Sequence, residues 1–146
     1  MGRLVLPDVN VLVYAFRPEE PRRAEYLSWL RGMAGGDQAY GMSDLVLSGF
    51  LRIVTNPRAF SDPDRLEDAM AFVSSLRSQP HCVPIGPGPR HWEIFTGLCT
   101  RSQAKGNLVA DAFLAALAIE HGCEWITTDR DYARFPGLRW RHPLEP

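Results

Sequence analysis

Apolar residues along the chain follow two patterns: short continuous runs, and longer segments in which they recur every three or four positions. Short runs bounded by turn residues are typical of buried strands, and the longer spacing is that of one helix face. We therefore expect strands at residues 3–6, 39–42, 82–85, 125–128 and 138–141. Helices are expected at 9–16, at 21–34, from Ser43 to just before Asn56, from Asp62 through Leu76, from Pro89 through Leu98, and at 108–121.

The alternation of strands and helices along the whole chain predicts the fold class. Strands joined by helices pair in parallel, with right-handed crossovers and with helices on both faces of the sheet. The sequence contains no internal repeat and no linker long enough to divide it, and its 146 residues are the size of one ordinary domain. We predict a single domain over residues 1–146 with an α/β fold, a three-layer α/β/α sandwich around a mainly parallel central sheet.

Composition narrows the class of protein without naming a partner. Hydrophobic residues make up 45% of the chain, so a folded core is expected, and a formal net charge of −1 gives no bulk attraction to nucleic acid. Cys82, Cys99 and Cys123 lack a CxxC spacing and are expected to be reduced thiols. The first residues form neither a signal peptide nor a membrane span. We expect a cytoplasmic protein that does not contact a membrane.

Acidic residues follow three of the predicted strands. Asp8 comes directly after the first strand, Asp44 comes just after the second, and Asp129 follows the run Trp-Ile-Thr-Thr. In a parallel sheet the carboxyl ends of the strands share one edge, and open α/β sheets bind their ligands at that edge. The three carboxylates are therefore predicted to lie near one another.

Asp111 lies in the first turns of a helix that is apolar on almost every side. Residues 112–119 contain no polar side chain, so this helix is expected to be deeply buried. An ionised carboxylate in such a place is costly unless it is paired or bound to a metal. The alternative is that Asp111 only complements the helix dipole or pairs with an arginine. The presence of Asp8 and Asp129 favours the functional interpretation.

Clustered carboxylates without histidine or cysteine partners are typical of a site for a hard divalent cation, Mg²⁺ or Mn²⁺. Such an ion can activate a water and neutralise charge on a phosphate, which suits phosphoryl chemistry. Asn10 and Thr128 could support the ligands by hydrogen bonds, and a helix cap and a strand residue are their alternative roles. Asp131 is interpreted as the cap of a short helix through Arg134, with a place in the site as the alternative.

Four segments, in this order, resemble the PIN domain and, within it, the VapC-type toxins. They are LPDVNVLVYAF, GMSDLVLSGFLRIVTNPRAF, LVADAFLAALAIEHG and WITTDRDYARFPGLRW. The resemblance implies a three-layer α/β/α fold and Mg²⁺- or Mn²⁺-dependent cleavage of RNA by the toxin of a toxin–antitoxin pair. It also implies a homodimer and a cognate VapB-type antitoxin whose tail covers the acidic groove. The metal-ligand roles fall on Asp8, Asp111 and Asp129.

One position departs from the family pattern. The pattern has a glutamate in the helix after the second strand, where this chain has Gly49, and no glutamate occurs between Glu25 and Glu67. Asp44 stands five residues earlier, at the expected N-terminus of the same helix. We predict that Asp44 completes the acidic cluster. The alternative is that it only complements the helix dipole.

Two other classes of function are open to a chain with these residues. A phosphatase of the haloacid-dehalogenase type would use Asp8 as its nucleophile, but Asn10 stands where a second acid is wanted, and the single lysine, Lys105, falls in a predicted loop. The second class is a catalytically inactive PIN domain that only binds RNA or a protein. The three separated carboxylates, one of them in an apolar helix, favour the metal-dependent ribonuclease.

Overall fold

Residues 3–145, described by a computed structural model, form five short strands. The strands are β1 (Val5–Pro7), β2 (Tyr40–Met42), β3 (Cys82–Pro84), β4 (Glu124–Ile126) and β5 (Trp140–Arg141). β4 pairs with both β1 and β5, β2 pairs with β3, and each of these pairs is parallel. All five strands lie where the apolar runs predicted them, although each is shorter than or shifted from its run by a residue or more.

The two sets of paired strands meet where β2 lies beside β1. A Cβ atom at Gly41 would lie 3.4 Å from the carbonyl oxygen of Val5 and 2.9 Å from a side-chain carbon of Ile85. The backbones approach so closely here that glycine is the residue that fits without a shift of its neighbours. β1 therefore lies between β2 and β4, and the sheet is mainly parallel, as predicted.

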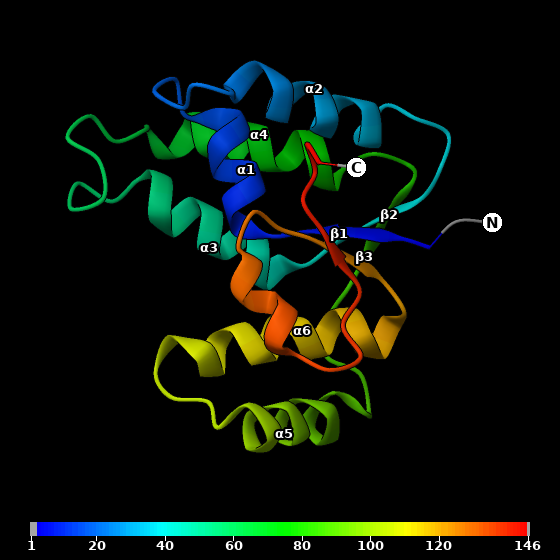
Figure 1. Ribbon diagram of the computed structural model, residues 1–146. Helices are drawn as coiled ribbons and strands as arrows, with labels where there is room; N and C mark the ends of the chain where they lie inside the picture. Colours follow the sequence, from blue (N-terminus) through cyan, green and yellow to red (C-terminus); the bar gives the residue numbers. More distant parts are fainter. Residues whose placement is uncertain (1–2, 146) are drawn as a thin grey trace.

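Helices cover both faces of the strands. They are α1 (Val9–Phe16), α2 (Arg23–Ala34), α3 (Asp44–Val54), α4 (Leu66–Arg77), α5 (His91–Ser102) and α6 (Asn107–His121), with a short 3-10 helix, η1 (Arg130–Arg134). Figure 1 shows α1, α2 and α4 on one side of the strands and α6, with α5 outside it, on the other. This arrangement confirms the predicted three-layer α/β/α class. Within residues 3–145 no helix combines the length and the apolar character that crossing a bilayer requires.

α4 begins later than the sequence pattern predicted, at Leu66 rather than at Asp62. The preceding loop is held by Arg17, which follows α1. The Arg17 guanidinium donates to the backbone carbonyl of Asp62 at 2.9 Å and pairs with the Asp64 carboxylate at 2.8 Å. Its side chain is 7% exposed and stacks over the ring of Phe60. These contacts fix the loop in a non-helical path and tie it to α1.

α6 lies against the sheet because most of its inward side chains are small. Its fully buried residues are Ala112, Ala115, Ala116, Leu117 and Ala118. The helix ends at Gly122, which adopts a left-handed conformation with φ of 65° and lets the chain turn back into β4. Because α6 leads directly into the start of β4, its first turns, which carry Asp111, lie at the opposite end, where β4 finishes.

Candidate metal centre

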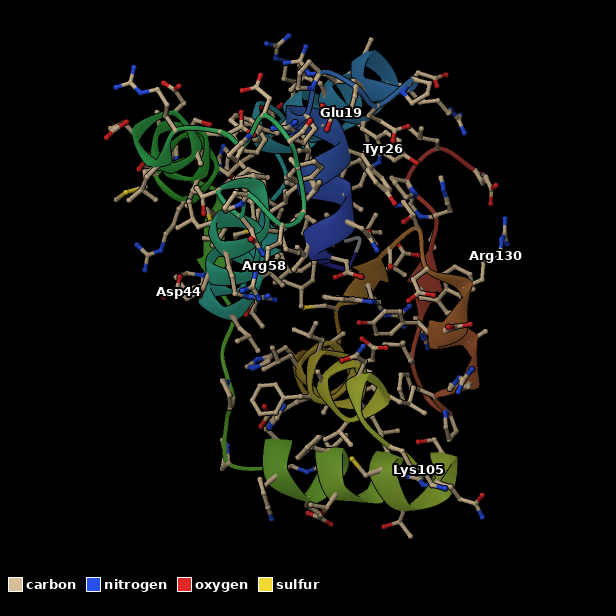
Figure 2. The ribbon with its side chains drawn as sticks, turned by 90° about the vertical axis from the view of Figure 1, so that its left-hand side faces the viewer. Glu19, Tyr26, Asp44, Arg58, Lys105 and Arg130 are labelled. Carbon is tan, nitrogen blue, oxygen red and sulfur yellow. The ribbon has the colours of Figure 1, made fainter. Side chains whose placement is uncertain are left out.

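Three of the four predicted acidic residues line one pocket at the edge where the strands end. Asp8 directly follows β1, Asp129 follows β4, and Asp111 comes from α6. The pocket has a volume of about 340 Å³. Its other lining residues are Val9, Asn10, Val13, Tyr14, Ile53, Leu114 and Tyr132. Figure 2 looks onto this edge, with α1 rising from the centre, α6 below it and η1 to the right.

Asp8 is firmly held because it is buried and also caps α1. The residue is 5% exposed. Its Oδ1 accepts a hydrogen bond from the backbone N–H of Val9 at 2.6 Å. Its Oδ2 accepts from the Thr127 hydroxyl at 2.7 Å and from the Asn10 side-chain amide at 3.2 Å. These neutral donors fix the orientation of the carboxylate, and within residues 3–145 no cationic side chain pairs with its negative charge.

Thr127 is a site residue that sequence reasoning missed. The residue is fully buried, and its hydroxyl oxygen also accepts from the Asn10 amide at 3.2 Å and from the backbone N–H of Asp129 at 3.1 Å. It therefore connects Asp8 to Asp129. Thr128, the neighbouring residue for which a supporting role and a plain strand role were both open, donates its backbone N–H to Asn10 Oδ1 at 3.3 Å. The available signal was the alternation of side chains along an extended segment, which places neighbouring threonines on opposite faces.

Asp111 is held by a phenol. The Tyr132 hydroxyl donates to Asp111 Oδ1 at 3.2 Å. Tyr132 itself is 2% exposed, and its ring centroid lies 5.5 Å from that of Trp125 and 5.8 Å from that of Phe135. Asp111 thus has a neutral partner in the pocket, in place of the arginine that a purely structural ion pair would supply.

Asp129 caps η1, because its Oδ1 accepts from the backbone N–H of Asp131 at 2.9 Å. The Asp131 side chain is 70% exposed and lies 3.8 Å from the Arg134 guanidinium. The expected short helix through Arg134 is therefore present, but Asp129 is its cap and Asp131 occupies its first turn. Asp131 does not line the pocket.

Burial and mutual repulsion raise the pKa values of two pocket acids. Desolvation raises the pKa of Asp8 from 3.8 to about 6; the charges of Asp111 and Asp129 add to the rise, while hydrogen bonds from Thr127 and a backbone amide oppose it. Burial is also the main cause that raises the pKa of Asp111, with the charge of Asp129 adding to it and the hydrogen bond from Tyr132 opposing it. A cation among these carboxylates would offset the cost of ionising them.

Asp44 lies outside this pocket. It is the first residue of α3, and its carboxylate pairs with the Arg77 guanidinium of α4 at 2.9 Å while its side chain remains 72% exposed. Figure 2 shows Asp44 on the outer side of α3, away from α6 and η1. The structure therefore does not bring Asp44 to the other three acids, because the start of α3 directs this side chain toward α4. The ion pair and the helix dipole account for its position.

Gly49, by contrast, borders the pocket. A Cβ atom there would lie 3.2 Å from a methyl carbon of Val9, which is one of the pocket-lining residues. The position at which the family pattern has a glutamate therefore faces the site, and this chain supplies no carboxylate from it. Asp8, Asp111 and Asp129 are the acids that line the described pocket.

The donors in the pocket fit a hard divalent cation, because they are carboxylate oxygens. Within residues 3–145, no side chain or backbone group donates a hydrogen bond to Oδ2 of Asp111 or of Asp129, so each carboxylate keeps one oxygen for a ligand. In the same range, no three Asp, Glu, His or Cys side chains converge closely enough to enclose an ion by themselves. An ion here would fill the rest of its coordination shell with water or substrate oxygens, as Mg²⁺ usually does.

Comparisons with known proteins define the class. The sequence matches the PIN domain over residues 5–138, and the chain therefore belongs to the PIN-domain family. Its relatives include ribonuclease VapC43 of Mycobacterium tuberculosis, 46% identical over 138 residues and 94% of both chains. Ribonuclease VapC25 of the same organism is 40% identical over 140 residues, which cover 96% of this chain and 99% of the relative.

Solved structures share the fold at low sequence identity. The structure of VapBC2 from Rickettsia felis, bound to a DNA fragment from its promoter, matches with a TM-score of 0.70 at 19% identity and covers 95% of this chain and 98% of that one. VapC20 of Mycobacterium tuberculosis matches with a TM-score of 0.62 at 16% identity, over 92% and 98% of the two chains.

Membership of the PIN family, shown by the match over residues 5–138, removes the phosphatase alternative, in which Asp8 would be a nucleophile.

Proposed function

We propose that the protein is a divalent-metal-dependent endoribonuclease and acts as the toxin of a toxin–antitoxin pair. The observation that carries this proposal is the pocket that Asp8, Asp111 and Asp129 line at the carboxyl edge of the sheet. The relatives that cover almost the whole chain are named as VapC ribonucleases, which supports RNA as the substrate.

The residues of the pocket divide into ligands and supports. Asp8, Asp111 and Asp129 would hold Mg²⁺ or Mn²⁺ through carboxylate oxygens. When bound, the ion would lower the pKa of a water and neutralise charge on the scissile phosphate. Thr127 and Asn10 keep Asp8 in one orientation by hydrogen bonds to Oδ2. Hydrolysis by a metal-activated water would leave a 5′-phosphate and a 3′-hydroxyl, as the family resemblance implies.

Two exposed cations on the same face are suited to contact RNA phosphates. Arg58 lies in the loop after α3, and Lys105 lies in the loop between α5 and α6. Figure 2 shows them on different sides of the centre of this face. Within residues 3–145 neither forms an ion pair with an acidic group. We infer that they hold the RNA backbone while the acids hold the ion.

The test is cleavage of RNA by purified protein with Mg²⁺, with Mn²⁺ and with EDTA. We expect cleavage only with metal, 5′-phosphate ends, and no cleavage by Asp111→Asn. Asp44→Asn is the matched control, because it removes an aspartate charge from the same face of the molecule but outside the pocket, and it should cleave like wild type. Cleavage that survives EDTA would contradict the proposal. RNA binding without cleavage under every metal condition would favour the inactive binding domain instead.

The proposed partners are a VapB-type antitoxin and a second copy of the chain. Five large apolar side chains are exposed in residues 3–145: Leu45, Leu66, Met70, Trp92 and Val109. A hollow of about 360 Å³ between α2 and α4 is also lined mainly by apolar residues, among them Leu27, Leu30 and Phe72. An exposed apolar hollow of this kind favours a protein partner. Co-expression with the adjacent reading frame should yield a complex. Light scattering of the isolated protein should give the mass of a dimer. A monomer without a co-purifying partner would contradict both proposed partners.

We also infer that an enzyme of this kind works on RNA in the cytoplasm.

A further inference from the structure

The segment that begins with Asp129 orients two of the three pocket carboxylates. Asp129 Oδ1 is occupied by the backbone N–H of Asp131, and Asp111 Oδ1 is occupied by the Tyr132 hydroxyl. Within residues 3–145, Oδ2 of both acids accepts no hydrogen bond. The same turn of η1 thus fixes one oxygen of each carboxylate and leaves the other available.

The packing around Tyr132 restricts the position of its ring and therefore the position of its hydroxyl. The residue is 2% exposed, and its ring packs between Trp125 and Phe135. Its backbone carbonyl accepts from the N–H of Phe135 at 3.2 Å, which fixes the turn that carries it. Phenylalanine would fill the same volume, so packing alone requires the ring and does not require the hydroxyl.

We propose that Tyr132 is a positioning residue of the metal centre, whose hydroxyl holds Asp111 by Oδ1 so that the carboxylate binds the ion through Oδ2 alone. The inference rests on the proposed function, because it concerns the metal that the pocket would bind. Without the phenol, Asp111 could rotate about its last side-chain bond or present both oxygens. Loss of a hydrogen-bond partner behind a metal ligand typically lowers metal affinity by about 10- to 100-fold.

The experiment compares Tyr132→Phe with Tyr40→Phe in the full-length protein. Tyr40 is also buried, at 1% exposed, and its hydroxyl donates to the backbone carbonyl of Leu76, which does not line the acidic pocket. Each variant therefore loses one buried phenol hydroxyl and keeps the ring. Binding of Mn²⁺ is followed by electron paramagnetic resonance of the free ion, and folding by near-ultraviolet circular dichroism and thermal unfolding.

Tyr132→Phe should bind Mn²⁺ at least about tenfold more weakly than wild type while its circular dichroism spectrum is unchanged. Tyr40→Phe should bind Mn²⁺ like wild type, although it unfolds at a lower temperature. Equal Mn²⁺ affinity of Tyr132→Phe and wild type would overturn the positioning role and leave the proposed function intact. A wild-type protein that does not bind Mn²⁺ would overturn the metal centre itself.

A second measurement on the wild type does not depend on how the variant folds. The infrared difference spectrum on adding Mn²⁺ reports whether a carboxylate binds through one oxygen or two, and comparison with Asp111→Asn assigns the band of Asp111. We expect the wide separation of carboxylate stretches that one-oxygen binding gives. A narrow separation, characteristic of binding through both oxygens, would overturn the proposal.

Discussion

Lowering the pH from 7.5 to 5.0 should weaken Mn²⁺ binding by this protein about tenfold, because Asp8 takes up a proton over that range. Burial raises the pKa of Asp8 to about 6. About nine-tenths of the Asp8 carboxyls would then be protonated at pH 5.0 and about 3% at pH 7.5, and a proton competes with the metal for the carboxylate. An aspartate at its ordinary pKa of 3.8 would change the affinity by less than about 10% over the same range. The raised pKa of Asp111 acts in the same direction and makes the dependence steeper.

The same shift fixes the sign of a stability effect. The folded-state pKa of Asp8 lies above its value in the unfolded chain, so the folded state binds the proton more tightly. The contribution of Asp8 to stability is complete below about pH 4 and is lost as the pH rises through about 6, and the two-unit shift corresponds to about 3 kcal/mol. Mn²⁺ bound to the proposed site would remove this cost at neutral pH. The rise in unfolding temperature that Mn²⁺ causes should therefore be larger at pH 7.5 than at pH 5.0.

Calorimetric titration of Mn²⁺ between pH 5.0 and 7.5 measures the effect directly. Repeating it near pH 6 in two buffers of different ionisation enthalpy counts the protons released, and we expect about half a proton per ion from Asp8. Asp44→Asn is the control, since Asp44 is exposed and outside the pocket, and its binding curve should follow that of wild type. A Mn²⁺ affinity that stays constant down to pH 5.0 would show that Asp8 is either an ordinary aspartate or not a ligand.

Three further predictions concern one residue that supports Asp8, the arginine that holds the loop before α4, and the two cations proposed to contact RNA. Thr127→Val keeps the side-chain shape but removes the hydroxyl that donates to Asp8, so the midpoint of the pH dependence should move upward and the free energy of unfolding should fall by about 1–3 kcal/mol in a urea titration. Arg17→Met removes the buried guanidinium that holds the loop before α4 and should lower the free energy of unfolding by about 1.5–3 kcal/mol, again measured in urea, with Mn²⁺ affinity nearly unchanged in the folded protein. The double change Arg58→Ala and Lys105→Ala should weaken RNA binding without changing Mn²⁺ affinity. The slope of log binding constant against log salt concentration should become shallower by about 0.7 per lost phosphate contact. An unaltered slope would remove these two residues from the RNA interface.

The sequence was sufficient for the features that depend on local pattern. Apolar spacing located the strands and helices, and the rule that parallel strands end at one edge brought Asp8 and Asp129 together. Asp111 could be identified because it stands in the first turns of an apolar helix, although in the structure its side chain is half-buried and the fully buried residues of the helix begin at Ala112. These inferences hold because the backbone alone, without knowledge of distant side chains, fixes where those three residues lie.

Features that depend on side-chain direction and on distant partners could not be obtained in the same way. Asp44 stands at the end of a strand like Asp8, but its direction is set by Arg77, 33 residues along the chain. Thr127 and Thr128 are equivalent in composition, and the register of β4 decides which one reaches Asp8. Tyr132 carries no signal of its own, because its role exists only once η1 is placed beside Asp111.

Because Gly49 has no side chain, the pocket contains three carboxylates rather than four. A glutamate there would add a fourth negative charge to a pocket in which burial and repulsion already raise the pKa values of Asp8 and Asp111. The chain instead surrounds three acids with neutral donors, such as the hydroxyls of Thr127 and Tyr132. Neutral donors orient a carboxylate without adding to the repulsion. Metal affinity in this protein should therefore depend on how firmly the three carboxylates are held in their orientation. Removing a single hydroxyl that orients one of them tests the proposed metal site more directly than adding a fourth acid.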